Sequence, residues 1–123
     1  MKASDTGWRH LLNSTRYSLK GLRSAFRHET AFRQEVGVSL VLLPLAWWVG
    51  DEPLEWIVLI GSWLLVMITE LLNSAIECVV DRIGAEHHEL SGRAKDISSA
   101  AVMLSLVVVA VTWGLLLGQK FIG

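Results

Sequence analysis

The sequence of 123 residues contains a single cysteine, Cys78. One cysteine excludes a disulfide within the chain, so oxidation does not hold this fold together. The N-terminus lacks the pattern of a cleavable signal peptide, in which a short basic stretch is followed at once by an apolar segment, and we expect none. The sequence shows no internal repeat and no low-complexity tract. We therefore expect one domain over residues 1–123.

The sequence also lacks the common signatures of nucleotide chemistry. It has no GxxxxGK[ST] phosphate loop and no HRD or DFG kinase motif, so any nucleotide site would be of an unusual type. The adjacent His87 and His88 do not share a helix face and have no third soft ligand nearby, which favours loop histidines over a zinc site. Cys78 is interpreted as a small packing residue rather than a reactive thiol.

Hydrophobic residues make up 52% of the chain, which is high for a soluble domain of this size and normal for a small membrane protein. The 23 residues of 97–119 carry no charge, which is long enough to cross an apolar bilayer core of roughly 30 Å. Residues 36–50 are also uncharged, and 56–76 are interrupted only by Glu70. The pattern predicts an all-α membrane protein with three transmembrane helices, at about 30–49, 54–82 and 94–119.

The basic residues are distributed unevenly. Seven Lys or Arg residues precede residue 36 and three lie in 81–96, whereas 50–55 has none and carries three acids. Cytoplasmic loops collect Lys and Arg. This predicts a cytoplasmic N-terminus and a cytoplasmic 81–96 loop, with the 50–55 turn and the C-terminus outside.

Residues 8–27 alternate between apolar and basic positions with helical spacing. The apolar positions form one stripe: Trp8, Leu11, Leu12, Thr15, Leu19, Leu22 and Phe26. Arg, Lys, His and Asn occupy the remaining faces. We expect this helix to lie in the membrane interface with its basic residues toward anionic headgroups, since the spans leave little soluble protein on which it could pack instead.

A polar stripe runs through the second predicted span. Its members are three, four and four residues apart, and so share a helix face: Glu70, Asn73, Glu77 and Asp81. Glu70 lies roughly 16 Å along the helix from Asp81, at a rise of 1.5 Å per residue. Burying a carboxylate at that depth costs several kcal/mol unless it is paired, protonated or bound to metal. Such groups are candidates for function, although Glu70 could instead fix helix packing.

Four further charged residues are expected at a similar depth to the cytoplasmic half of this stripe: Glu29, Glu35, Lys95 and Asp96. Oxygen ligands suit Mg²⁺ rather than zinc. A nearby lysine would neutralise a transferring phosphate, and a deeper carboxylate could accept a proton from a hydroxyl. The set therefore fits phosphoryl transfer to a lipid hydroxyl at the membrane interface.

Two other classes of function remain open from the residues alone. Proton-coupled transport uses the same residue types, and a structural oligomer would use Glu70 and the small residues of 98–101 for packing. Three helices of this length cannot enclose a large polar site, so we infer a homo-oligomer with its acidic faces turned into shared interfaces. The spacing does not set the number of subunits.

Four segments resemble the motifs of the small prokaryotic integral-membrane diacylglycerol kinases: YSLKGLR at 17–23, AFRQE at 31–35, ELLNSAIECVVDR at 70–82 and ELSGRAKD at 89–96. The resemblance covers almost the whole chain. It implies a homotrimer in the bacterial inner membrane, with three spans and one surface helix per chain and with active sites shared between chains. It implies transfer of the ATP γ-phosphate to diacylglycerol, which yields phosphatidic acid. Similar proteins of Gram-positive bacteria phosphorylate undecaprenol, which is the alternative acceptor.

The resemblance also implies roles for single residues. Glu70 would be the general base, and Glu29 and Glu77 would hold the Mg²⁺. The ATP site would comprise Tyr17, Glu29, Glu77, Glu86, His87, His88, Lys95 and Asp96. The lipid site would comprise Glu35, Glu70, Asn73 and Ser99. His10 stands where the family usually has an arginine, so His10 on the ATP side or Arg9 on the lipid side would take that role.

Overall fold

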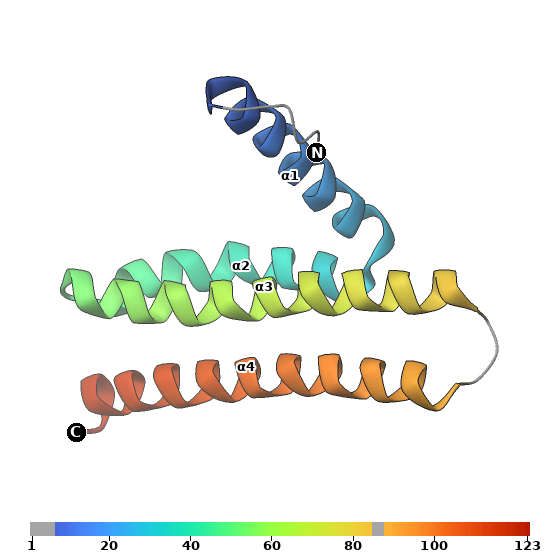
Figure 1. Cartoon of the computed structure of the whole chain (residues 1–123). Helices are drawn as coiled ribbons and strands as arrows, with labels where there is room; N and C mark the ends of the chain where they lie inside the picture. Colours follow the sequence, from blue (N-terminus) through green and yellow to red (C-terminus); the bar gives the residue numbers. More distant parts are fainter. Residues whose placement is uncertain (1–6, 85–87) are drawn as a thin grey trace.

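The computed structural model describes residues 7–84 and 88–123, and the regular secondary structure within these ranges is all α-helical. The helices are α1 (Gly7–His28), α2 (Thr30–Val49), α3 (Pro53–Ile83) and α4 (Glu89–Phe121) (Figure 1). The expected all-α class is confirmed. Helix α1 covers the segment predicted to be amphipathic, while its position at a membrane surface stays a prediction.

The three long helices run alongside one another, and α1 leaves them at an angle. Helix α3 is central, since it packs on both α2 and α4, whereas α1 contacts α2. The first turns of α1 stand away from the other helices, and its last turn meets the start of α2 (Figure 1). A single chain is therefore open, with α1 projecting from one side.

Two of the described helices, α3 and α4, are long and apolar enough to cross a membrane. Large apolar residues that are exposed on α4 recur at three or four residues: Leu104, Val107, Val111 and Leu115. A helix with apolar residues on its outer face is typical of a protein surrounded by lipid or by further chains. The crossing of the membrane by α2, which contains Pro44, stays a prediction.

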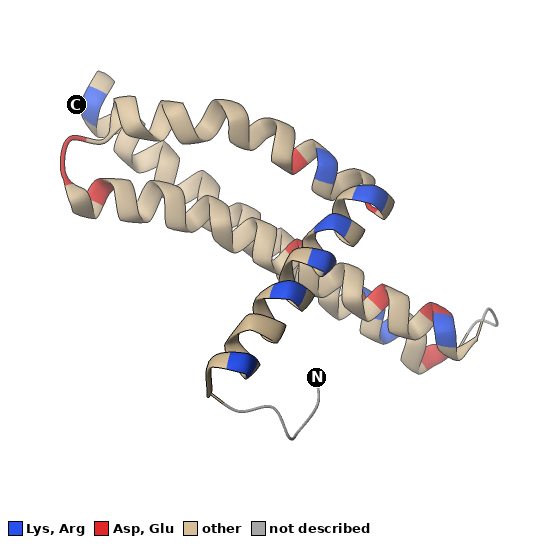
Figure 2. Cartoon of the chain, turned by 90° about the horizontal axis from the view of Figure 1, so that it is seen from above, with Lys and Arg blue, Asp and Glu red and all other residues tan. Residues whose placement is uncertain are grey.

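Apart from Glu70, charged residues lie toward the ends of the long helices. Figure 2 shows Lys and Arg along α1, and Asp and Glu both in the α2–α3 turn and toward the opposite end of the long helices, with long uncharged stretches between. In the turn, Lys120 of α4 pairs with Asp51 at 2.5 Å and with Glu55 at 2.9 Å. These pairs join the end of α4 to the acidic turn and to the first turn of α3.

The hydrophobic core lies at the same end of the molecule. Its buried members come from all three long helices: Ala46, Val49, Leu59 and Trp113. The Trp113 Nε1–H donates a hydrogen bond of 3.2 Å to the Leu59 carbonyl, which satisfies the polar atom of the indole in its buried position. Apolar burial and ion pairing thus both hold the helices together near the 50–55 turn.

Gly50 ends α2 where two tryptophans stack. The rings of Trp47 and Trp56 lie 4.6 Å apart, and Trp56 Nε1–H donates to the Trp47 carbonyl at 3.3 Å. A Cβ atom on Gly50 would collide with the ring of Trp56. The ring cannot move aside freely because it is held by both contacts. Glycine is therefore required here for the close approach of the backbone to the indole.

We expect Gly50→Ala to lower the free energy of unfolding by about 1–3 kcal/mol, the usual cost of overpacking. Gly61→Ala is the matched control, since a Cβ atom there meets nothing within 4 Å. Unfolding by sodium dodecyl sulfate in mixed micelles measures both. Equal stability of the two variants would show that Trp56 moves aside without cost.

Candidate functional site

The site is centred on Glu70, in the middle of α3. Its side chain is buried, with 9% of the residue exposed, although the surrounding helix is apolar. The carboxyl groups of Glu70 and Glu35, on α2, lie within hydrogen-bonding range of each other. Two carboxyl groups share a hydrogen bond only when one of them carries a proton. The two carboxyl groups can therefore lie this close only with a shared proton or a cation nearby.

Glu35 contributes a second unusual feature. Its Oε1 atom is buried and has no hydrogen-bonding partner among the described residues. A buried carboxylate oxygen without a donor is costly, so such atoms call for an explanation. A donor that enters the site, such as a substrate hydroxyl, would satisfy it.

Glu29 approaches Glu70 from the corner between α1 and α2. It is the N-cap residue of α2, yet its side chain makes no capping hydrogen bond. Its charge, like that of Glu77, acts on Glu70, which places the three carboxylates in one electrostatic environment. Because the Glu29 carboxylate is not used for capping, it is available to a cation.

Glu77 is held by a short chain of hydrogen bonds between α3 and α4. Asn73 Nδ2 donates to Glu77 Oε1 at 2.6 Å, and the buried Ser98 hydroxyl donates to Asn73 Oδ1 at 2.6 Å. The two bonds together fix the orientation of the Asn73 amide. One oxygen of Glu77 is used in this chain, and the other remains for a ligand.

In the structure, the residues of the predicted polar stripe on α3 contact two different neighbouring helices. Glu70 meets Glu35 on α2, whereas Asn73 and Asp81 meet residues of α4. Asp81 Oδ1 accepts a hydrogen bond of 2.8 Å from Lys95, whose ammonium group also interacts with Glu77. This pair is solvent-exposed, and such pairs contribute little to stability. Lys95 is therefore able to exchange Asp81 for a phosphate.

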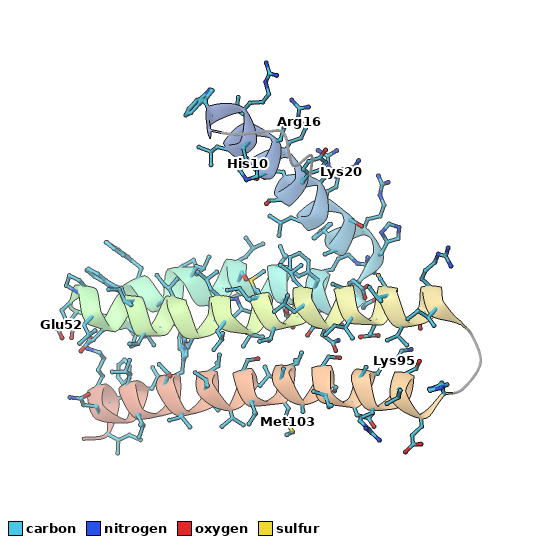
Figure 3. The ribbon with its side chains drawn as sticks, viewed as in Figure 1. His10, Arg16, Lys20, Glu52, Lys95 and Met103 are labelled. Carbon is cyan, nitrogen blue, oxygen red and sulfur yellow. The ribbon has the colours of Figure 1, made fainter. Side chains whose placement is uncertain are left out.

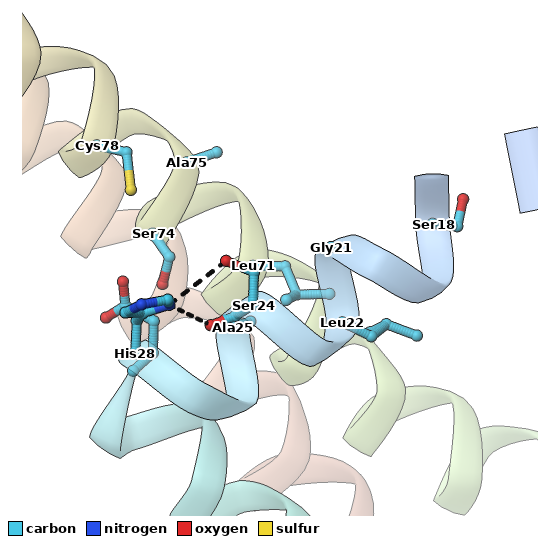
Figure 4. A pocket seen from close by; sticks show the side chains of 11 residues that line it. Ser18, Gly21, Leu22, Ser24, Ala25, His28, Leu71, Ser74, Ala75 and Cys78 are labelled. Atoms are coloured by element: carbon cyan, nitrogen blue, oxygen red, sulfur yellow. Dashed lines mark hydrogen bonds between the residues drawn. The ribbon is translucent and has the colours of Figure 1, made fainter. Parts of the chain in front are cut away.

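A cavity of about 580 Å³ lies between α1 and α3, beside Glu29 (Figure 4). Its walls are largely apolar, from residues such as Leu22, Ala25 and Leu71, and its polar end is formed by His28, Glu29 and Ser74. In Figure 4, Ser74 and Cys78 project from α3 toward His28. An apolar cavity with carboxylate at one end suits an amphipathic molecule with a polar head.

A second cavity, of about 430 Å³, lies between α3 and α4 where small residues face each other. Thr69, Asn73, Ala94, Ser98 and Ala101 line it. Of these, Ser98 and Ala101 belong to the small residues of 98–101 that were expected to favour close helix contact. The small side chains leave a groove along part of the contact between α3 and α4. The hydrogen bond between Ser98 and Asn73 crosses this groove.

Within one chain the structure joins only some of the predicted site residues. Glu29, Glu35, Glu70, Asn73, Glu77 and Lys95 form the connected set described above. No described contact links that set with Arg9, His10, Tyr17, Asp96 or Ser99. Figure 3 shows His10 near the start of α1, far from Lys95. His88 caps α4, since its Nδ1 accepts from the Leu90 N–H at 3.0 Å, and Glu86 and His87 lie outside the described residues.

Sequence reasoning did not single out two residues that support this set. Ser98 orients Asn73, and Arg33 binds the end of α1 next to Glu29. The spacing of serines in an apolar helix does not indicate which one meets a polar partner on another helix. Arg33 was counted only as one of the cytoplasmic charges, although it lies in a quoted motif.

The carboxylates fit a hard cation such as Mg²⁺. In the part of the chain that the structure describes, no three His, Cys, Asp or Glu side chains converge on one metal site. Mg²⁺ commonly binds through one or two carboxylates and completes its shell with phosphate oxygens and water. Glu29 and Glu77, each with a carboxylate oxygen left over, are consistent with that mode of binding.

Comparison with known proteins gives one consistent result. The family described as prokaryotic diacylglycerol kinase matches residues 16–117. A diacylglycerol kinase of Haemophilus influenzae is 58% identical over 109 residues, which is 89% of this chain and 92% of that protein. That of Escherichia coli K12 is 49% identical over 121 residues, 98% of this chain and 99% of the relative. That of Pseudomonas aeruginosa is 48% identical over 112 residues, 91% of each.

The hydrogen bond between Asn73 and Ser98 is testable without any ligand. We expect Asn73→Ala and Ser98→Ala each to lower the free energy of unfolding by about 1 kcal/mol, because Asn73→Ala leaves the Ser98 hydroxyl only its longer bond of 3.0 Å to the Lys95 carbonyl, and Ser98→Ala removes the donor to Asn73 Oδ1. The double variant should lose less than the sum, with a coupling of about 0.5–1.5 kcal/mol. Unfolding in mixed micelles measures the cycle. Additive effects would contradict the bond.

Proposed function

Because the chain belongs to the prokaryotic diacylglycerol kinase family and is an ATP-dependent lipid kinase, we propose that its site residues carry out this reaction as follows. The γ-phosphate of ATP passes to the free hydroxyl of 1,2-diacylglycerol, and the products are phosphatidic acid and ADP. The observation that carries the assignment of roles is the burial of Glu70 at the centre of three further carboxylates.

Glu70 is the general base. The lipid hydroxyl oxygen attacks the γ-phosphorus while the bond from that phosphorus to the β–γ bridging oxygen breaks, and ADP leaves. The hydroxyl proton passes to the Glu70 carboxylate, and Glu35 beside it supports this position by exchanging the proton. General base catalysis of this kind contributes typically 10²–10⁴-fold in rate. Asn73 and Ser99 lie on the lipid side of the site.

Glu29 and Glu77 hold the cation, for which we propose Mg²⁺. A bound Mg²⁺ supplies positive charge against the phosphate oxygens in the transition state. Glu77 is kept in place by Asn73, and Glu29 is presented by the corner between α1 and α2. Lys95 exchanges Asp81 for a phosphate oxygen, and Asp96, Tyr17, His10, Glu86, His87 and His88 complete the nucleotide site.

The lipid reaches the site from the membrane. In this proposal α2 crosses the membrane as α3 and α4 do, α1 lies on the cytoplasmic face of the inner membrane, and the C-terminus is periplasmic. The apolar cavity beside Glu29 accommodates the glycerol end and the first part of an acyl chain, with Arg9 and Glu35 on the lipid side. The ends of α3 and α4 near Lys95 carry the basic residues expected on the cytoplasmic side.

The functional unit is a homotrimer in this proposal. Two observations support an assembly of chains: the exposed apolar face of α4, and the separation within one chain of His10 from Lys95. A neighbouring chain would supply His10 and would cover the apolar face. Sites shared between chains account for both features.

The acceptor is tested by ³²P transfer from Mg-ATP in mixed micelles, with diacylglycerol and undecaprenol offered separately. We expect label on diacylglycerol, because the matching family and the similar proteins are diacylglycerol kinases. Label on undecaprenol alone would keep the mechanism and overturn the substrate. Label on neither, from folded and oligomeric protein, would favour a transporter.

Glu70→Gln should lower kcat by at least 10²-fold and leave nucleotide binding nearly unchanged, because the amide keeps the shape of the side chain and cannot accept the proton. Equilibrium binding of a fluorescent ATP analogue, measured beside turnover, separates the two effects. Wild-type turnover in this variant would refute the assignment of Glu70 as base.

Glu77→Gln should instead weaken nucleotide binding and raise the Mg²⁺ concentration needed for half-maximal activity by at least about 10–100-fold, which is the usual cost of losing even a residue that supports a metal ligand. A titration of activity with Mg²⁺ at fixed ATP measures this. If the Mg²⁺ requirement stayed at the wild-type value while kcat alone fell, Glu77 would not be a metal ligand.

A further inference from the structure

Arg33 joins the surface helix to the rest of the chain in a way that no sequence motif indicates. It lies in the first turn of α2, and its Nη1 atom donates to two backbone carbonyls at the end of α1, those of Phe26 at 2.9 Å and Arg27 at 2.8 Å. Its Nη2 atom donates to the Thr30 hydroxyl at 3.2 Å. One guanidinium thus spans the corner between the two helices.

These carbonyls need a donor from outside the helix. The last four carbonyls of an α-helix have no partner in the helical ladder beyond its end. The Ala25 carbonyl is satisfied by the Glu29 N–H at 2.8 Å, and those of Phe26 and Arg27 are satisfied by Arg33. A cation at this end is also favoured by the helix dipole. The guanidinium therefore acts as a cap that originates from the next helix.

Glu29 is the single residue between α1 and α2, and the bonds from Arg33 to the end of α1 are made across it. Its carbonyl accepts the N–H of Arg33 at 3.1 Å, and its own side chain is left without a capping bond. The same residue lines the cavity between α1 and α3 and acts electrostatically on Glu70. The direction of its carboxylate therefore depends on the angle at which the two helices meet.

The angle also matters farther along α1. Tyr17 lies eleven residues before His28, or roughly 16 Å along the helix. A change of about 10° at the corner would move it by roughly 3 Å, and misplacements of about 1 Å already impair positioned reactions. A loose corner would therefore disturb both the cation ligand and the predicted ATP contact on α1.

We propose that Arg33 is a positioning residue, which fixes the angle between α1 and α2 by capping the Phe26 and Arg27 carbonyls and so places Glu29 and the α1 side of the cavity. This inference rests on the proposed function for its kinetic consequences, but the geometry can be tested without activity. Lysine is a poor replacement for arginine here, since its ammonium group could donate to the two carbonyls that Nη1 binds but has no second nitrogen for Thr30 and no rigid planar geometry to hold the corner.

The test compares Arg33→Gln and Arg33→Lys with Arg27→Gln. The Arg27 variant removes the same charge at the same corner and retains the backbone carbonyl that Arg33 binds. We expect both Arg33 variants to raise the KM for Mg-ATP about 5–20-fold and to lower kcat about tenfold. Arg27→Gln should stay within twofold of wild type in both. If Arg33 acted only as a charge for lipid or nucleotide phosphate, Arg33→Lys would retain most activity, which would overturn the proposal.

The position of α1 is read directly through the native Cys78, which lines the cavity opposite Ala25. In an Ala25→Cys background, a short bifunctional maleimide should link the two thiols within a chain, as identified from the linked peptide by mass spectrometry. Cys78→Ser is the negative control. Arg33→Gln and Arg33→Lys should slow the linkage severalfold, and Arg27→Gln should not.

The outcomes separate the two proposals. Unchanged linkage and unchanged KM in the Arg33 variants, even with lower thermal stability, would reduce Arg33 to a stabilising cap and overturn its positioning role. If the Arg33 variants link more slowly but the wild-type protein transfers no phosphate, the positioning role is supported and the kinase mechanism is refuted.

Discussion

A carboxylate inside an apolar helix controls the arrangement of this protein. Glu70 cannot face lipid without a large penalty, so α3 must turn it toward another polar group. The structure satisfies this with Glu35 of α2, and the charges of Glu29 and Glu77 reach the same point. Helix α3 is consequently central, since its polar residues need partners on both neighbouring helices. Four acidic groups that act on one another would repel, and a cation with bound phosphate relieves that repulsion.

The two ends of the long helices are stabilised by different means. Near the 50–55 turn, apolar burial around Leu59 and Trp113 combines with the ion pairs of Lys120, and this end is well packed. Near Glu70 and beyond, side-chain hydrogen bonds and cavities replace tight packing. The well-packed end near the 50–55 turn fixes the helices relative to one another, and the end near Glu70 leaves cavities in which substrates could bind. This division is typical of sites that trade local stability for function.

The helices themselves follow from the sequence with little ambiguity. Apolar runs and the 3.6-residue period place all four segments, and Glu70 stands out because it interrupts an apolar run. The division of the polar stripe was not predictable, because residues 70 and 73 lie about 60° apart on a helix and this difference decides which neighbour each one meets. The bond from Ser98 to Asn73, the cap by Arg33 and the ion pairs of Lys120 depend on tertiary contacts, which periodicity does not encode.

The central claim is that Glu70 takes the proton of the lipid hydroxyl, and the most direct test varies the acidity of that hydroxyl. Phosphoryl transfer would be measured for wild type and Glu70→Gln with a series of diacylglycerol analogues that carry fluorine at increasing proximity to the hydroxyl. If Glu70 is the general base, the ratio of the two rates falls as the hydroxyl becomes more acidic, because an acidic alcohol needs less help. A ratio that stays constant across the series would contradict the role of Glu70 as base and would leave it a part of the packing alone.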